Sequence, residues 1–112
     1  MAVLSNVGLF GTSTRTNTLI VVHLLEETHA SEIARILDRS LSRIQDALES
    51  LERAGVVVGN EEGKMRRIRL NPRYFARTEL TVLLSKLAEA DPALQSTISQ
   101  LRRRPRRSGK EI

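Results

Sequence analysis

The stretch Ala30–Val57 reads ASEIARILDRSLSRIQDALESLERAGVV, and its apolar residues recur at helical spacing in two blocks. The polar pair Asp38–Arg39 separates these blocks. Ser40 is a favourable N-cap for the second block, and Gly55 stands where a helix often ends in a left-handed residue. The sequence therefore predicts two short helices joined by a tight turn, of which the second covers residues 41–54.

Helical patterns flank this pair on both sides. Residues 16–27 carry apolar side chains on most faces of a helix, which predicts a largely buried first helix. Ser31 is the expected N-cap of the second helix. Helical spacing returns after residue 79, and Pro92 either ends that helix or begins a weaker one that reaches Leu101.

Between these helices the pattern changes to that of strands. Residues 56–58 are three β-branched valines, and residues 65–70 alternate between apolar and basic side chains. Gly63 permits the positive φ that a turn over residues 59–64 requires. The whole order predicts a mainly α fold with a small β-hairpin. We expect a winged helix-turn-helix with a three-helix core, a two-stranded wing over residues 56–70 and a C-terminal helix.

The net charge is concentrated at the C-terminal end of the chain. The 18 Lys and Arg residues and 13 Asp and Glu residues give a net charge of +5. Residues 102–112 hold six of these cations and one of the acids, so the remainder is neutral with twelve of each. We expect one winged helix-turn-helix domain with terminal dimerisation segments over residues 1–101, followed by a basic disordered tail over residues 102–112.

The sequence offers little for catalysis or metal binding. The chain has no cysteine, which excludes disulfides and every cysteine-based metal site. His23 and His29 are its only histidines, and their spacing fits neither a helical ligand pair nor a zinc finger. It carries no phosphate-binding glycine loop and no nucleophile motif. We expect no enzyme activity, no cofactor and no metal, and, since no apolar stretch is long enough to span a bilayer, a cytoplasmic protein without membrane contact.

The stretch Ala30–Val57 resembles, without a gap, the helix-turn-helix of ArsR-like transcription regulators. The hairpin GNEEGKMRRIRLNP (Gly59–Pro72) is similar to their wing, and Gly11–Leu25 fits their first helix. Metal-sensing members carry cysteines at the start of the third helix or clusters of acids and histidines elsewhere. This chain has neither, so the resemblance does not imply metal sensing. The matching positions of the helix-turn-helix are Ser31, Ile33, Ala34, Leu37, Ser40, Ile44, Leu48, Leu51, Ala54, Gly55 and Val57.

The resemblance implies a regulator that binds double-stranded DNA and reads a specific sequence. In such a motif the outer face of the second helix enters the major groove, its N-terminal part above all. Arg43 suits guanine, Gln45 suits adenine and Asp46 suits cytosine. Ser40 and Ser42 lie near the helix N-terminus and suit phosphate. A solvated face of mixed charge is the alternative interpretation of these residues.

The wing is more basic than this helix. Six cations lie between Gly63 and Thr78 with no acid among them, as a hairpin along the DNA backbone or minor groove requires. Two or three of the six are expected to pair instead with Glu26, Glu27 or Glu52 of the body. The wing residues predicted to contact DNA are Lys64, Arg66, Arg67 and Arg69.

An apolar stripe follows the hairpin and predicts a homodimer. The three-helix body needs only part of this stripe, and the apolar N-terminus adds surplus hydrophobic surface. Members of the resembled family commonly dimerise through their terminal helices. The predicted interface is Leu80, Leu83, Leu84 and Leu87, next to Val3, Leu4, Val7, Leu9 and Phe10.

A protein-interaction module is the alternative function. The first helix, the wing and the Leu70–Pro72 ending also resemble short winged-helix modules found beside nucleotidyltransferase domains. In that interpretation the acidic face of Asp46 and Glu49 docks a partner protein, for example a nucleotidyltransferase, and there is little specific DNA binding.

Overall fold

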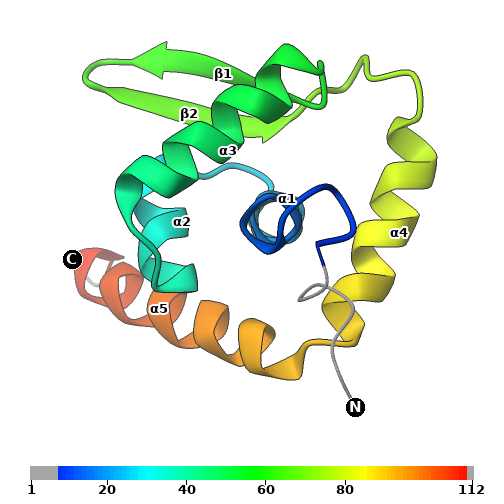
Figure 1. The fold of residues 1–112 in the computed structure, drawn as a ribbon. Coiled ribbons are helices and arrows are strands. Elements are labelled where there is room, and N and C mark those ends of the chain that lie inside the picture. The colour runs from blue at the N-terminus through cyan, green and yellow to red at the C-terminus, as the bar shows by residue number, and fades with distance from the viewer. Residues whose placement is uncertain (1–7, 111–112) are drawn as a thin grey trace.

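The computed structural model describes the backbone of residues 8–110 and the side chains of residues 8–102. Three helices are followed by a two-stranded antiparallel hairpin and two further helices (Figure 1). The predicted mainly α, winged helix-turn-helix architecture is confirmed. The elements are α1 (Ser13–Leu25), α2 (Ala30–Leu37), α3 (Leu41–Arg53), β1 (Val57–Glu62), β2 (Met65–Leu70), α4 (Arg77–Glu89) and α5 (Pro92–Lys110).

Helix α1 lies at the centre of the fold. Figure 1 shows it end-on with the other helices around it, and it packs against α2, α3, α4 and β2. Seven consecutive residues, Thr16–Val22, are buried, which explains why apolar side chains occupy most faces of this helix. It begins at Ser13, earlier than predicted, because the side chain of Thr12 caps it by accepting from the Arg15 N–H at 3.0 Å.

Helix α2 and the turn after it differ in detail from the prediction. His29, not Ser31, is the N-cap, since its Nδ1 accepts a hydrogen bond from the Glu32 N–H at 3.3 Å. Asp38 turns the chain toward α3 with a left-handed backbone (φ 56°), which Asp adopts more readily than most residues. This places Arg39 at the junction of α1, α2 and α3.

Helix α3 agrees with the prediction at both ends. The Ser40 hydroxyl accepts from the Arg43 N–H at 3.3 Å, and Gly55 has a positive φ of 79° just after the helix. The buried stripe lies at helical spacing and packs α3 on α1 and α2, which leaves the opposite face of α3 to solvent. The buried residues are Ile44, Ala47, Leu48 and Leu51.

The hairpin is longer than the sequence predicts. β1 continues to Glu62, so the turn is reduced to Gly63–Lys64, with Gly63 at φ 65°. Glu61 lies opposite Arg66 across the ladder, and this pair of opposite charges stabilises a strand whose own propensity is low. Thr28 exchanges backbone hydrogen bonds of 3.0 and 2.8 Å with Ile68 on the other edge of β2, which fixes the wing to the body.

The C-terminal end also differs from the sequence expectation. α5 begins at Pro92, lies against α2 and α4, and is helical to Lys110, beyond the expected start of a disordered tail at residue 102. Arg102 is held against the body by Glu32 of α2, at 2.9 Å between Nε and Oε2. An argument from composition misses this contact because it counts charges without their partners. Residues 111–112 lie outside the described part.

Candidate nucleic-acid interface

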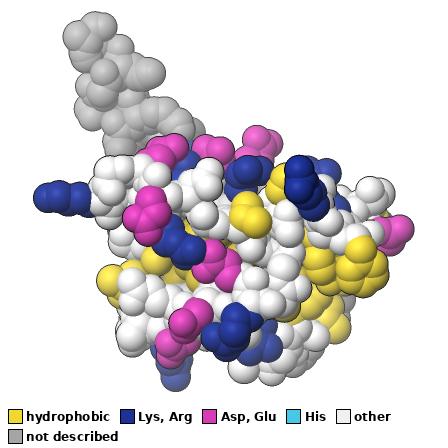
Figure 2. All heavy atoms as spheres, turned by 90° about the horizontal axis from the view of Figure 1, so that it is seen from above, with side chains coloured by type: hydrophobic (Ala, Val, Ile, Leu, Met, Phe, Trp, Pro, Cys, Tyr) yellow, Lys and Arg dark blue, Asp and Glu magenta, His cyan; other side chains and the backbone are white. Residues whose placement is uncertain are grey.

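The exposed face of α3 carries the residues expected to contact DNA. Ser42, Arg43, Gln45 and Asp46 are all exposed, and Ser40 is exposed at the helix N-terminus. They lie on one element and next to the wing, so the fold brings the two predicted contact regions together. Figure 2 views the molecule from above and shows basic and acidic side chains intermixed on the surface that it presents.

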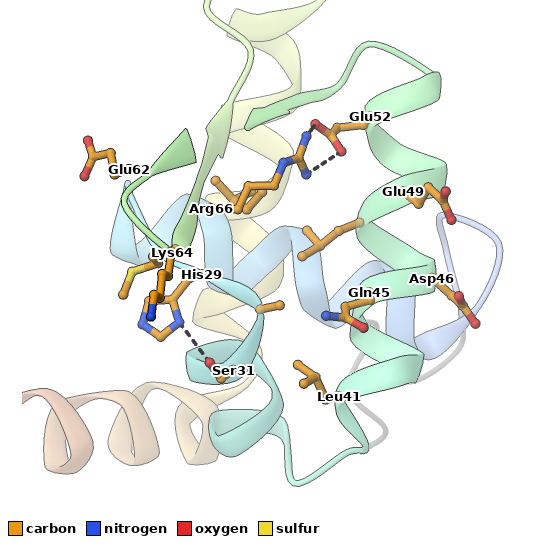
Figure 3. A pocket seen from close by; sticks show the side chains of 14 residues that line it. His29, Ser31, Leu41, Gln45, Asp46, Glu49, Glu52, Glu62, Lys64 and Arg66 are labelled. Atoms are coloured by element: carbon orange, nitrogen blue, oxygen red, sulfur yellow. Dashed lines mark hydrogen bonds and ion pairs between the residues drawn. The ribbon is translucent and has the colours of Figure 1, made fainter. Parts of the chain in front are cut away.

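A groove of about 970 Å³ separates α3 from the wing and the start of α2. Gln45 points into the groove from α3, and His29 and Lys64 face it from the other side (Figure 3). Asp46 and Glu49 lie on its rim and point away from its interior. The groove is therefore lined by both polar and apolar side chains, with the carboxylates of Asp46 and Glu49 at its edge.

Arg66 crosses this groove to Glu52 of α3. Its Nη1 donates to Oε1 at 2.9 Å and its Nη2 donates to Oε2, a bidentate ion pair (Figure 3). The hydrogen bonds that Arg66 donates to Glu52 raise the pKa of its guanidinium above the ordinary value. The charge that was expected to meet phosphate is thus already compensated within the protein.

The other wing cations divide between paired and unpaired. Arg67 lies 3.2 Å from Glu62 and 3.9 Å from Glu27, so it too is compensated. Arg69 is half-buried on the opposite face of the hairpin, near Glu26 and Arg102. Lys64 is exposed at the turn and forms no ion pair within the described side chains. The expected pairing of some wing cations with body carboxylates is confirmed for Glu27 and Glu52.

A second hollow, of about 400 Å³, lies on the other flank of α3. Arg39 of the turn and Arg43 of α3 meet Arg15 of α1 there, and the sequence analysis singled out only Arg43. No local signal connects these positions, because Arg15 is more than twenty residues from Arg39 and they meet only when α1 packs on α3. The lining is completed by Thr12, Ser13, Thr14, Asp46 and Ala47.

Residues 4–80 match the family model described as the sugar-specific transcriptional regulator TrmB. The chain belongs to the TrmB family. The match spans α1, α2, α3 and the wing and ends at Leu80, early in α4. The family is one of DNA-binding transcription regulators and not of enzymes, and the ArsR-like subtype expected from the sequence is not confirmed. No curated protein and no solved structure matches the chain.

The leucines of α4 have two different environments in this TrmB-family chain. Leu80, Leu84 and Leu87 are buried in the protomer's own core, the last two at 0% and 1% exposure. Leu83 is 39% exposed, and its neighbour Val82 is 58% exposed. Of the four leucines predicted to form the dimer interface only Leu83 is accessible, since α1 already covers the face that the other three share, and Leu9 before α1 is 51% exposed. Val3, Leu4 and Val7 lie outside the described residues.

The two histidines have structural partners. His23 of α1 is partly buried, as expected, and its Nε2 lies 2.9 Å from the Ser85 hydroxyl of α4. Burial lowers the pKa of His23 and outweighs the nearby Glu26 carboxylate, which raises it. His29 caps α2.

Residues 8–102 contain no cluster of three or more histidine or acidic side chains that could hold a metal ion. No helix in the described part is long and apolar enough to cross a membrane.

Proposed function

We propose that this TrmB-family regulator reads a specific DNA sequence by placing α3 in the major groove. The exposed face of α3 supports this, because its N-terminal half presents Ser42, Gln45 and Asp46 to solvent beside the capped end at Ser40. Gln pairs with adenine and Asp accepts from cytosine through the major groove. The first turn of α3 contains no acid, which suits a phosphate near Ser40.

The wing contacts the DNA backbone or the minor groove in this proposal. Lys64 at the turn is the most accessible of its cations, and Arg69 lies on the far face of the hairpin. Arg66 and Arg67 contribute only where phosphate displaces Glu52, Glu62 or Glu27, since these carboxylates hold them in the free protein. The wing is therefore a weaker backbone contact than its composition suggests.

A homodimer is the second part of the proposal. Val82 and Leu83 form an exposed apolar pair on α4, and a self-complementary contact there would bring two copies together about a two-fold axis. Two α3 helices would then meet two half-sites one helical turn of DNA apart, about 10 base pairs. The expected target is a palindromic sequence.

The alternative is a winged-helix module that docks a partner protein, for example a nucleotidyltransferase. The acids of α3 favour this alternative, because Asp46 and Glu49 lie on its exposed face and Glu62 lies on the wing. Carboxylates facing phosphate are repelled unless each of them accepts from a base. A basic partner surface would not meet this repulsion.

Selection of bound fragments from genomic DNA, followed by gel shifts, distinguishes the two functions. The regulator hypothesis predicts an enriched sequence with two related half-sites, bound at least a thousandfold more tightly than random duplex at physiological salt. Ser42→Ala and Gln45→Ala should change the enriched bases. Selection that returns no sequence, with weak binding that disappears at moderate salt, would contradict specific reading and favour the interaction module.

A further inference from the structure

We propose that Arg39 and Arg43 bind a backbone phosphate of DNA on the flank of α3 that faces α1, away from the wing. This inference rests on the proposed function, because it requires α3 to lie in the major groove. It also changes one role: Arg43 holds the backbone and does not read guanine. The partner chemistry is a phosphodiester at the edge of the groove that α3 enters.

The geometry of the α1 flank carries the proposal. Arg39 stands in the second hollow and donates from Nη1 to the Ser13 hydroxyl at 3.4 Å and to the Thr14 hydroxyl. Arg15 lies beside it and donates from Nη1 to the Phe10 carbonyl at 3.1 Å. Arg43 reaches the same hollow from α3, and its guanidinium makes no hydrogen bond or ion pair with any described side chain.

The two flanks of α3 carry net charges of opposite sign. The α1 flank holds three arginines and one carboxylate, that of Asp46. The groove on the wing side holds Lys64 and Arg66, with His29, against four carboxylates. Arg39 is hydrogen-bonded to neutral hydroxyls, which position it and leave its charge uncompensated, whereas Glu52 neutralises Arg66. A phosphate is therefore attracted more strongly to the α1 flank than to the wing side.

Helical geometry places Arg43 on the flank of α3 and not on its outermost face, which lies opposite the buried stripe. Arg43 and Gln45 are two positions apart in the sequence, so their side chains point about 160° apart around the helix axis. Gln45 points into the groove beside the wing (Figure 3), which puts Arg43 on the side of α1. An α-helix about 10–12 Å wide nearly fills a major groove about 12 Å wide. The flank toward α1, where Arg43 lies, then meets the phosphates that border the groove.

The experiment compares two duplexes, the fragment selected from genomic DNA and a scrambled duplex of the same length and composition. Arg43→Gln is the main variant because its side chain is exposed and makes no contact that folding needs. We expect it to weaken binding of both duplexes alike, by about tenfold at low salt, and to lower the salt slope by about one. Lys86→Gln on α4 removes the same charge from an exposed site of another element. It should change neither the affinity for the two duplexes nor the salt slope.

Arg39→Gln is a second variant, with its melting temperature measured because Arg39 also contacts α1. If this variant folds, it should show the same loss of affinity for both duplexes. A preference relaxed at one base pair by Arg43→Gln would overturn the proposal and make Arg43 a base reader. Unchanged binding of both duplexes would also overturn it.

Two further outcomes separate this inference from the proposed function. Equal binding of both duplexes by the wild type would remove specific reading, yet a uniform loss with Arg43→Gln would still support the phosphate site. Inorganic phosphate, added at matched ionic strength, is the second probe. Displacement of DNA from the wild type by phosphate, beyond that by chloride and absent in Arg43→Gln, would show that DNA and the free anion compete for the hollow and would support the phosphate contact. Phosphate binding that depends on Arg43 but leaves DNA binding unchanged would assign the hollow to a free anion and overturn the DNA contact.

Discussion

Arg66 and Glu52 form a bidentate ion pair that joins the wing to α3 across the groove between them. The two side chains are 46% and 23% exposed, so the pair adds no more than about 1 kcal/mol to the stability of the fold. Its larger effect is on binding. It holds β2 at a set distance from α3 and removes from the groove a positive charge that DNA would otherwise meet.

Glu52→Gln is expected to strengthen DNA binding. The amide keeps an oxygen that accepts from Arg66 and removes the carboxylate, so the guanidinium stays in place with less of its charge compensated. Affinity for all duplexes should rise several-fold at low salt, and the salt slope should steepen by as much as one. Fluorescence anisotropy at several salt concentrations measures both quantities. Glu89→Gln on α4 is the control, and equal binding by both variants would contradict this account of Arg66.

Leu83→Glu is expected to give a folded monomer. The side chain is 39% exposed in the single chain, so a carboxylate there costs little in the protomer and much in a dimer interface. Leu84→Glu is the informative comparison, because Leu84 is fully buried and the same change should unfold the chain. Light scattering and circular dichroism separate the two effects. A wild type that is monomeric at high concentration would rule out the dimer.

The apolar stripe of α4 illustrates what the sequence alone can and cannot predict. Helical spacing identifies α4, but it does not say which of its faces α1 covers. The sequence therefore predicts an interface at Leu80, Leu84 and Leu87, which the protomer buries in its own core. The ends of α3 were predictable because capping is local, through Ser40 and Gly55.

Contacts between distant segments explain the other differences. The polar half of β1 has low strand propensity, and only its pairing with β2 makes it a strand. The approach of Arg15 to Arg39 depends on the packing of α1 against α3. The sequence predicts that Glu52 pairs with a wing cation, but not that Arg66 is this cation or that the ion pair is bidentate, because both depend on the register of the hairpin.

Acidification is expected to destabilise the fold through His23. Burial lowers its pKa in the folded chain below the unfolded value of about 6.5, so the unfolded chain binds the proton more readily. Stability is therefore full above about pH 6.5 and falls as the pH drops from there through the folded pKa. Melting temperatures between pH 7.5 and pH 5.5 should fall less in His23→Gln than in the wild type. Parallel curves for the two proteins would show that His23 does not carry this effect.

Arg102→Gln is expected to lower the melting temperature. Burial of the Glu32 carboxyl opposes ionisation, but hydrogen bonds from Arg102 and Thr28 and the charge of Arg102 together lower its pKa. The pair thus stabilises the docking of α5 on α2 above the unfolded pKa of Glu32, about 4.3, and loses this effect as the pH falls below it. The difference in melting temperature between the wild type and Arg102→Gln should be clear at pH 7 and shrink toward pH 3. A constant difference would mean that Arg102 acts by packing alone.

Removal of the chain after Arg103 is expected to affect DNA binding without affecting the fold. This shortened protein keeps Arg102, whose side chain donates to Glu32 and to the Glu27 carbonyl, and so keeps the contact that anchors α5. The residues removed include four of the tail's six cations and no apolar residue except Pro105 and Ile112, so they contribute mainly screened, sequence-independent attraction to phosphate.

The shortened protein should melt at the wild-type temperature and retain sequence preference, with affinity lost mainly at low salt, where charges are least screened. Arg102→Gln should show the converse, a lower melting temperature with a salt slope reduced by no more than about one. Titration of one labelled site at several salt concentrations, with melting curves for both proteins, decides between these roles. Unchanged affinity of the shortened protein at the lowest salt would exclude DNA binding by the tail, and lost sequence preference would make the tail part of the reading surface.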